Sequence, residues 1–301
     1  MKCGISKQNL FIKEKEQQII WQIEPIMENR RIIIVNWMVE VINDSTFFTS
    51  QQHENFLHLS VSVFDRFINK NNVIPRNLQL ISIIAMYEVG KYFKSDKTIE
   101  DYIYITNDSY IKEEFLKYQK IVSAFFHHNF CFVTPIDFIY TSDIVMKNSV
   151  DYILNLSLVH KETKNYLPSF VAIATLYFIY NLYQRYWPEA SFPYKSKELE
   201  IFIPIIQSWI NKIERTSPIL QKFYSEERGY ISYYLQIINS TFEQYQNLLK
   251  QFSSIKQSNI TKNLPILEVW VENIKEYKKT LQLAGEGNYI FLRSTDVKGK
   301  D

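Results

Sequence analysis

The chain has 301 residues, of which 46% are hydrophobic and 22% charged, and its net charge is +2 because 34 basic residues nearly balance 32 acidic ones. These values are typical of a folded protein with one large or two ordinary domains, and the near-neutral charge argues against nucleic-acid and membrane-surface partners. Only six glycines occur, which argues against an architecture of strands and tight turns.

The N-terminal stretch, residues 1–18, lacks the uninterrupted apolar core of a signal peptide. The longest apolar run, residues 170–180, is shorter than the roughly 20 residues of a membrane-spanning helix. Two cysteines are too few for a disulfide framework and favour a reducing compartment. We therefore expect a protein of the nucleus, the cytoplasm or both. A short helix is predicted at residues 8–22, ending near Pro25.

Apolar residues recur at helical spacing through most of the chain, and no convincing alternating strand pattern occurs. In the first half this spacing predicts helices at residues 29–43, 51–69, 75–92, 98–105 and 110–127. The helix at 75–92 is apolar all round, so we expect the others to pack around it. The helix at 29–43 has only a narrow polar stripe, so it must be buried on most sides or covered by another molecule.

A second series of helices is predicted at residues 135–146, 148–159, 167–184, 197–212 and 218–227. The helix at 167–184 is again apolar all round, with Pro168 near its start, where proline is favoured. Two groups of about five helices, each around one buried helix, indicate an all-α chain with a doubled five-helix domain. The predicted divisions are a lead-in with one helix at 1–28, a first domain at 29–133, a second at 134–247, and a tail at 248–301 with one amphipathic helix around Trp270.

Several helices carry recognisable motifs. RIIIVNWMVEV, residues 31–41, resembles the cyclin-box signature, in which an arginine leads an aliphatic run into Asp-Trp-Leu-x-Glu-Val. HENFLHLSVSVFDRFIN resembles the cyclin helix Glu-Thr-Leu-His-Leu-Ala-x-x-x-x-Asp-Arg-Phe, and VIPRNLQLISIIAMYEVGKY and DYIYITNDSYIKEEFLKYQKIV resemble the two segments that follow it. YLPSFVAIATLYFIYNL and YSEERGYIS are similar to the second box of mitotic A- and B-type cyclins. The resemblance covers about residues 29–247 and implies two tandem cyclin folds in a divergent family member.

The resemblance implies roles for residues of the signature helix. Arg31 is expected to form a structural ion pair with Asp65 of the Asp-Arg-Phe motif. Family members also expose one edge of this helix as a groove for Arg-x-Leu docking peptides, and the alternative is that these residues are plain core. The matching groove positions are Ile33, Ile34, Trp37, Glu40, Leu78 and Gln79. Arg30 stands where the family has methionine, and its charge would disfavour basic peptides.

The resemblance also implies a cyclin-dependent kinase as partner, contacted through the third and fifth helices of the first box. Lys91 matches the lysine of that contact, whereas Gln119 replaces its glutamate and Ser123 a nearby leucine. Tyr92 begins a stretch that replaces Phe-Glu-Glu. The expected interface is therefore Lys91, Tyr92, Gln119 and Ser123, altered by the loss of a charged acceptor. We expect a subunit that binds and activates the kinase; the alternative is a cyclin-fold scaffold that does not activate one.

No pattern in the sequence supports an enzyme, a cofactor site or a metal site. His127, His128 and Cys131 offer three ligand types but no matching second pair, and adjacent histidines on one helix point apart, which favours a plain interhelical loop. The Gly-x-Gly at residues 284–289 lacks the preceding strand and third glycine of a phosphate loop. A transcription factor built from doubled cyclin folds is disfavoured because promoter binding needs a basic face.

Overall fold

The computed structural model describes residues 7–43, 52–140, 144–183 and 197–225, together with 228, 231–232 and 235–236. Every regular element in these residues is helical, which confirms the predicted all-α class. None of the described helices is both long and apolar enough to cross a membrane. The predicted tail helix around Trp270 lies outside the described residues.

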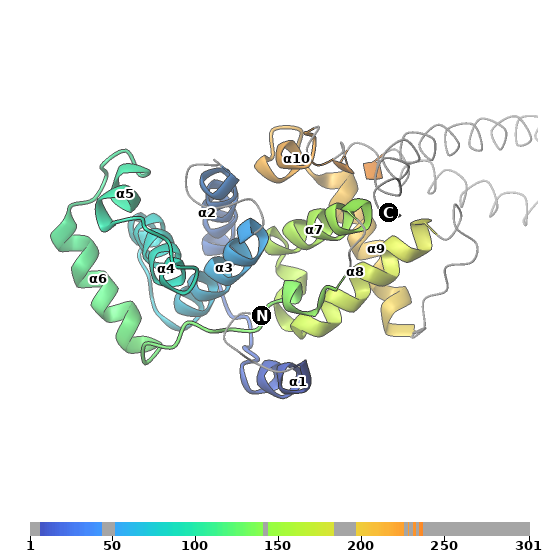
Figure 1. Cartoon of the computed structure of the whole chain (residues 1–301), viewed down its shortest axis with the longest axis horizontal. Helices are drawn as coiled ribbons and strands as arrows, with labels where there is room; N and C mark the ends of the chain where they lie inside the picture. The colour runs from blue at the N-terminus through green and yellow to red at the C-terminus, as the bar shows by residue number, and fades with distance from the viewer. Residues whose placement is uncertain are drawn as a thin grey trace, which may run out of the picture.

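Two groups of helices lie side by side, and α1 (Lys7–Glu16) lies below the junction between them (Figure 1). The first group consists of α2 (Pro25–Asn43), α3 (His53–Lys70), η3 (Pro75–Asn77), α4 (Leu78–Tyr92), α5 (Ile99–Tyr104) and α6 (Lys112–Phe125). Helix α4 is buried along most of its length and contacts α2, α3, α5 and α6, as its all-round apolar pattern predicts.

The second group consists of η4 (Pro135–Phe138), α7 (Ile144–Val159), η5 (Lys161–Asn165), α8 (Pro168–Tyr183), α9 (Lys197–Lys212) and α10 (Pro218–Lys222). Here α8 has the central place, because it packs against η4, α7 and α9. Helix α10 reaches across to α2 of the first group, and α7 contacts both α2 and α3. The two groups therefore share one continuous core.

The structure differs from two of the predicted helices. Helix α1 ends at Glu16 rather than near residue 22, and Pro25 opens α2 instead of closing α1, because proline is well tolerated in a first helical turn. The helix predicted at 135–146 is wrong: Pro135–Phe138 form the short turn η4, in which Thr134 donates its N–H and hydroxyl to Asp137 Oδ2 at 2.8 Å each. Helix α7 begins separately at Ile144.

Helix α1 is attached to the second group and, through the residue that follows it, to the connection between the groups. Glu14 is only 1% exposed, and its carboxylate accepts the N–H of Ser169 at 2.8 Å and the Ser169 hydroxyl at 2.6 Å. This carboxylate satisfies a free N–H in the first turn of α8, where the helix dipole also favours negative charge. Gln17, just after α1, donates to the Cys131 carbonyl at 3.1 Å and accepts the Val133 N–H at 2.9 Å. The connection between the two groups is thereby fastened to α1.

Candidate functional site

Three of the four predicted interface residues meet at one buried carboxylate. Glu88 on α4 is 3% exposed, and Lys91, one turn later, places Nζ 2.6 Å from Glu88 Oε2. From α6, Gln119 Nε2 donates to Glu88 Oε1 at 2.7 Å and Ser123 Oγ donates to the same oxygen at 3.3 Å. The Lys91 side chain is still 51% exposed. We call the surface formed by Lys91, Gln119 and Ser123 around Glu88 the α4–α6 face.

The C-terminal end of α4 sets the edge of this face. Lys94 has a left-handed backbone with φ 55°, and the N–H of Ser95 bonds to the Gly90 carbonyl at 3.0 Å, as in a Schellman cap. A Cβ on Gly90 would lie 2.8 Å from the hydroxyl oxygen of Tyr102, so a side chain there would force that hydroxyl to shift. Tyr92, the fourth predicted residue, is 45% exposed and accepts the Phe130 N–H at 3.2 Å.

Glu88 is not among the residues predicted from the sequence. It lies in a helix that reads as apolar all round, where an acidic residue is rarely given a role. The available signal was its position three residues before Lys91, a spacing at which helical side chains of opposite charge meet. The contribution of Gln119 and Ser123 could not be read in this way, because they are separated from Glu88 by 31 and 35 residues.

The predicted groove residues range from the surface to the core. Ile33 is 66% exposed and Glu40 is also exposed, and both lie on the outer side of α2. Ile34 and Trp37 are half-buried against the core, and Gln79 is half-buried on α4. Leu78 is 1% exposed, so it can form only the floor of a groove.

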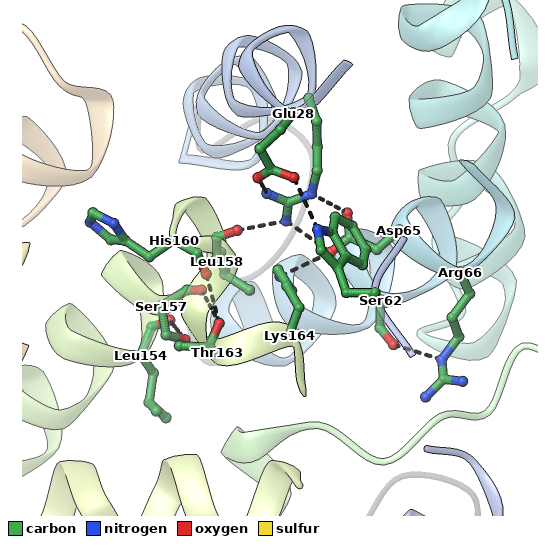
Figure 2. A network of polar contacts seen from close by, with 12 residues as sticks. Glu28, Ser62, Asp65, Arg66, Leu154, Ser157, Leu158, His160, Thr163 and Lys164 are labelled. Atoms are coloured by element: carbon green, nitrogen blue, oxygen red, sulfur yellow. Dashed lines mark hydrogen bonds and ion pairs between the residues drawn. The ribbon is translucent and has the colours of Figure 1, made fainter. Parts of the chain in front are cut away.

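Arg31 and Asp65 lie in contact in the structure, within a larger network (Figure 2). Arg31 is completely buried, and its Nε and one terminal nitrogen donate to the two oxygens of Asp65 at 2.6 and 2.8 Å. Its other terminal nitrogen lies 3.1 Å from Glu28 Oε1. From the second group, the Leu158 carbonyl accepts from Arg31 at 2.6 Å, and Lys164 Nζ lies 2.9 Å from Asp65 Oδ2. The pair therefore also joins the two groups of helices.

Burial and charge act in opposite directions on the pKa values of this network. Burial alone would raise the pKa of Asp65, but Arg31 and Lys164 outweigh it and lower that pKa. Burial, assisted by the repulsion of Arg31, lowers the pKa of Lys164 to about 8. In this network two cations, Arg31 and Lys164, both contact Asp65, and Glu28 is the second carboxylate.

A second buried charge cluster joins the groups at the start of α3. Glu54 is 5% exposed and is contacted by Lys222 Nζ at 2.9 and 3.0 Å and by an Arg228 nitrogen at 3.0 Å. Asn155 Nδ2 donates to Glu54 Oε2 at 2.8 Å. Burial would raise the pKa of Glu54, but Lys222 and Arg228 outweigh it and hold the value at about 2. All three partners come from the second half of the chain, so no local sequence pattern could predict this cluster.

The histidine and cysteine residues that suggested a metal do not form a site in the described part of the chain, where no group of three His, Cys, Asp or Glu side chains is arranged to hold a metal ion. His127 and His128 are exposed and have left-handed backbones, with φ 48° and 59°, in the turn that ends α6. Cys131 is disulfide-bonded, which the sequence analysis did not anticipate.

Comparison with known proteins agrees with the motifs. Residues 4–129 match the model of the cyclin N-terminal domain. The chain is 31% identical to G2/mitotic-specific cyclin-A of Drosophila melanogaster, over 50% of this chain and 31% of that protein. It is 27% identical to Cyclin-B2-3 of Arabidopsis thaliana, over 51% of this chain and 36% of that protein. It is 26% identical to Cyclin-A1 of Homo sapiens, over 60% of this chain and 40% of that protein.

The chain spans less than half the length of each of these three relatives. All three are named as cyclins of the A or B type, and the motifs of the first half lie inside or beside the matched domain. Residues 4–129 are therefore similar to a cyclin N-terminal domain, and about half of the chain is similar to A- and B-type cyclins.

Proposed function

We propose that this chain is a regulatory subunit that binds and activates a cyclin-dependent protein kinase in the nucleus, the cytoplasm or both. The α4–α6 face is the observation that carries the proposal. Lys91 comes from α4, and Gln119 and Ser123 come from α6, yet the three surround one carboxylate at the positions that the cyclin resemblance assigns to kinase contact. The half-exposed Lys91 side chain leaves donors free to reach a partner.

The activation mechanism follows from how protein kinases become competent. A kinase is active when its Lys–Glu pair and its metal-binding aspartate are both in place, which requires a mobile helix to be held inward. A partner that binds this inward state more tightly than the outward state shifts the population toward it. The chain thus does no chemistry itself, and its contribution to activity is a difference in affinity for the two kinase states.

The first test is recovery of the chain from its own cell extract. We expect a cyclin-dependent kinase to accompany it in near-equal amount, and the purified complex to phosphorylate a protein substrate much faster than the isolated kinase does. Substituting Lys91 with alanine should weaken this association, whereas the same change at exposed Lys161 should not. A recovered complex that contains other proteins and no kinase would contradict the proposal and favour a scaffold.

We include in the proposed function an Arg-x-Leu docking groove on α2. Arg30, Ile33, Trp37 and Glu40 recur at helical spacing on one side of α2, and all are at least partly exposed. A half-buried tryptophan beside an exposed isoleucine offers an apolar anchor for a leucine side chain. Glu40 offers a carboxylate for the basic residue of the peptide, a pairing that fixes register and specificity.

Reversing the charge of Glu40 tests this groove. Glu40→Lys should lower the affinity for a labelled Arg-x-Leu peptide about tenfold or more, because an attraction becomes a repulsion at the rim of the site. Arg30→Met should raise the affinity, since it removes a cation facing a basic peptide. Fluorescence anisotropy measures both, with Glu113→Lys on α6 as the control. Equal affinity of the wild-type and Glu40→Lys chains would show that the peptide does not bind here.

A further inference from the structure

We infer that Glu88, rather than the residue at position 119, supplies the carboxylate that positions Lys91, and that the α4–α6 face consequently accepts a kinase segment rich in carboxylate or carbonyl oxygens. This inference rests on the proposed function, because it specifies the chemistry of the partner bound at the same face. It also gives Gln119 and Ser123 a role as hydrogen-bond donors to Glu88. The resemblance to cyclins had indicated only that they replace a glutamate and a leucine of the kinase contact.

The carboxylate of Glu88 is fully engaged within the chain. Oε2 pairs with Lys91 at 2.6 Å, and Oε1 accepts from Gln119 at 2.7 Å and from Ser123 at 3.3 Å. The side chain is 4% exposed, so a partner cannot reach these oxygens directly. A buried carboxylate persists only when its oxygens are paired and hydrogen-bonded, and here one cation and two neutral donors meet that need.

Gln119 and Ser123 complement Glu88, because both are hydrogen-bond donors and its carboxylate is an acceptor. Both donate to the same oxygen, and an acidic residue at position 119 could not donate there while ionised. Its carboxylate would instead lie at hydrogen-bonding distance from that of Glu88, where two like charges oppose each other. An acid at position 119 and an acid at position 88 therefore exclude each other, and this chain has the acid at 88.

The charge that remains on the surface is positive. Within three residues of Lys91 and of Gln119, the charged residues are Glu88, Lys94, Lys117 and Lys120 in addition to Lys91 itself. Lys94, Lys117 and Lys120 are exposed, and the one acidic residue is buried. A segment that docks on Lys91 thus meets its exposed ammonium group, while the carboxylate paired with it is buried. Carboxylate side chains, or the free carbonyls at a helix C-terminus, satisfy such donors, whereas a basic segment is repelled.

Moving the carboxylate from one position to the other tests the role of Glu88. The probe is the cyclin-dependent kinase recovered with the wild-type chain, and its affinity for the full chain is measured by titration. Glu88→Gln and Gln119→Glu should each weaken binding about tenfold, because the first removes the partner of Lys91 and the second sets two carboxylates against each other. The double variant E88Q/Q119E should bind within about threefold of wild type, because one carboxylate and one amide again face each other.

A loss of binding through unfolding is identified by thermal unfolding of each variant. The single variants should lose kinase affinity at a temperature where they are still folded, whereas a merely structural role for Glu88 would lower affinity only as far as it lowers the folded fraction. Tighter binding by Gln119→Glu alone, or a double variant no better than either single one, would overturn the assignment of Glu88.

A second experiment tests the chemistry of the partner and leaves the buried carboxylate of Glu88 in place. Lys91→Gln should weaken kinase binding about tenfold, and Lys91→Glu about a hundredfold, because a glutamate would face the acceptor oxygens of the kinase. Wild-type binding should weaken as salt is raised from 50 to about 300 mM, and that dependence should shrink in Lys91→Gln. Lys161→Glu, on the second group of helices, is the matched control and should bind like wild type.

Equal binding by the glutamine and glutamate variants of Lys91 would overturn the acidic-partner inference while leaving the proposed function standing. Failure of the wild-type chain to bind any cyclin-dependent kinase would overturn both. The wild-type measurement therefore separates failure of the function from failure of the inference.

Discussion

Replacing Arg31 with methionine should lower the free energy of unfolding by about 3–5 kcal/mol, the cost of removing one partner from a buried ion pair. Arg31 is fully buried and serves three acceptors: Asp65, Glu28 and the Leu158 carbonyl. Methionine fills a similar volume but donates no hydrogen bond. Asp65 would retain Lys164, whereas the Leu158 carbonyl would lose the donor that the arginine supplies.

Urea-induced unfolding at neutral pH measures this effect. The adjacent Arg30 is exposed, so Arg30→Met is a matched control and should change the free energy of unfolding by less than about 0.5 kcal/mol. Because a whole domain is stabilised by only about 5–15 kcal/mol, the Arg31 variant should lose a large part of its stability. A loss below about 1 kcal/mol would mean that Lys164 and water replace the arginine.

Glu54→Gln should have a comparable effect, about 3–5 kcal/mol, for the opposite reason. Here the cations are left behind, since Lys222 is 4% exposed and the carboxylate contacts it at both oxygens. A glutamine keeps the shape and can still accept from Asn155, but it cannot neutralise Lys222 and Arg228. The double variant E54Q/K222M should recover part of the loss, because it removes one uncompensated cation. Glu16→Gln, at the exposed end of α1, is the control.

Glu54→Gln should also change how the free energy of unfolding depends on pH. The folded pKa of Glu54 is about 2, below the ordinary value of 4.5, so its stabilising contribution is complete above about pH 4.5 and is lost as the pH falls through about 2. His160 acts in a different window, because burial lowers its pKa from 6.5 to about 4 and stability falls as the pH drops through that interval. Unfolding midpoints should therefore decline less steeply below pH 4.5 in Glu54→Gln than in wild type. Parallel curves for the two proteins would contradict the assigned pKa.

The sequence predicted most helices because their apolar residues recur with the helical period. It located α4 and α8 within a few residues, since helices that are apolar all round have few alternative placements. It failed around Pro25 and Pro135, where a proline could end one helix or start the next, and the tertiary structure decides which occurs. The division into 1–28, 29–133, 134–247 and 248–301 remains a prediction.

The site was predicted only as far as the family motifs extend. The resemblance indicated Lys91 and position 119, and it paired Arg31 with Asp65. It did not indicate Glu88, Leu158, Lys164 or the Glu54 cluster, because contacts between residues 31 to 174 positions apart depend on how the helices pack. The missed charged residues Glu88, Lys164 and Glu54 each proved to have a partner of opposite charge.

The attachment of α1 to the first turn of α8 has a consequence for how the chain is made. Glu14 leaves the ribosome 155 residues before Ser169, the group that its carboxylate binds. At roughly 5–20 residues per second this is a delay of about 10–30 s, during which the first helix has no α8 to bind. Contacts of such long range are made late in folding because a large loop must close before they form. Helix α1 is thus synthesised early but reaches its final place late, and its docking reports that α8 has formed.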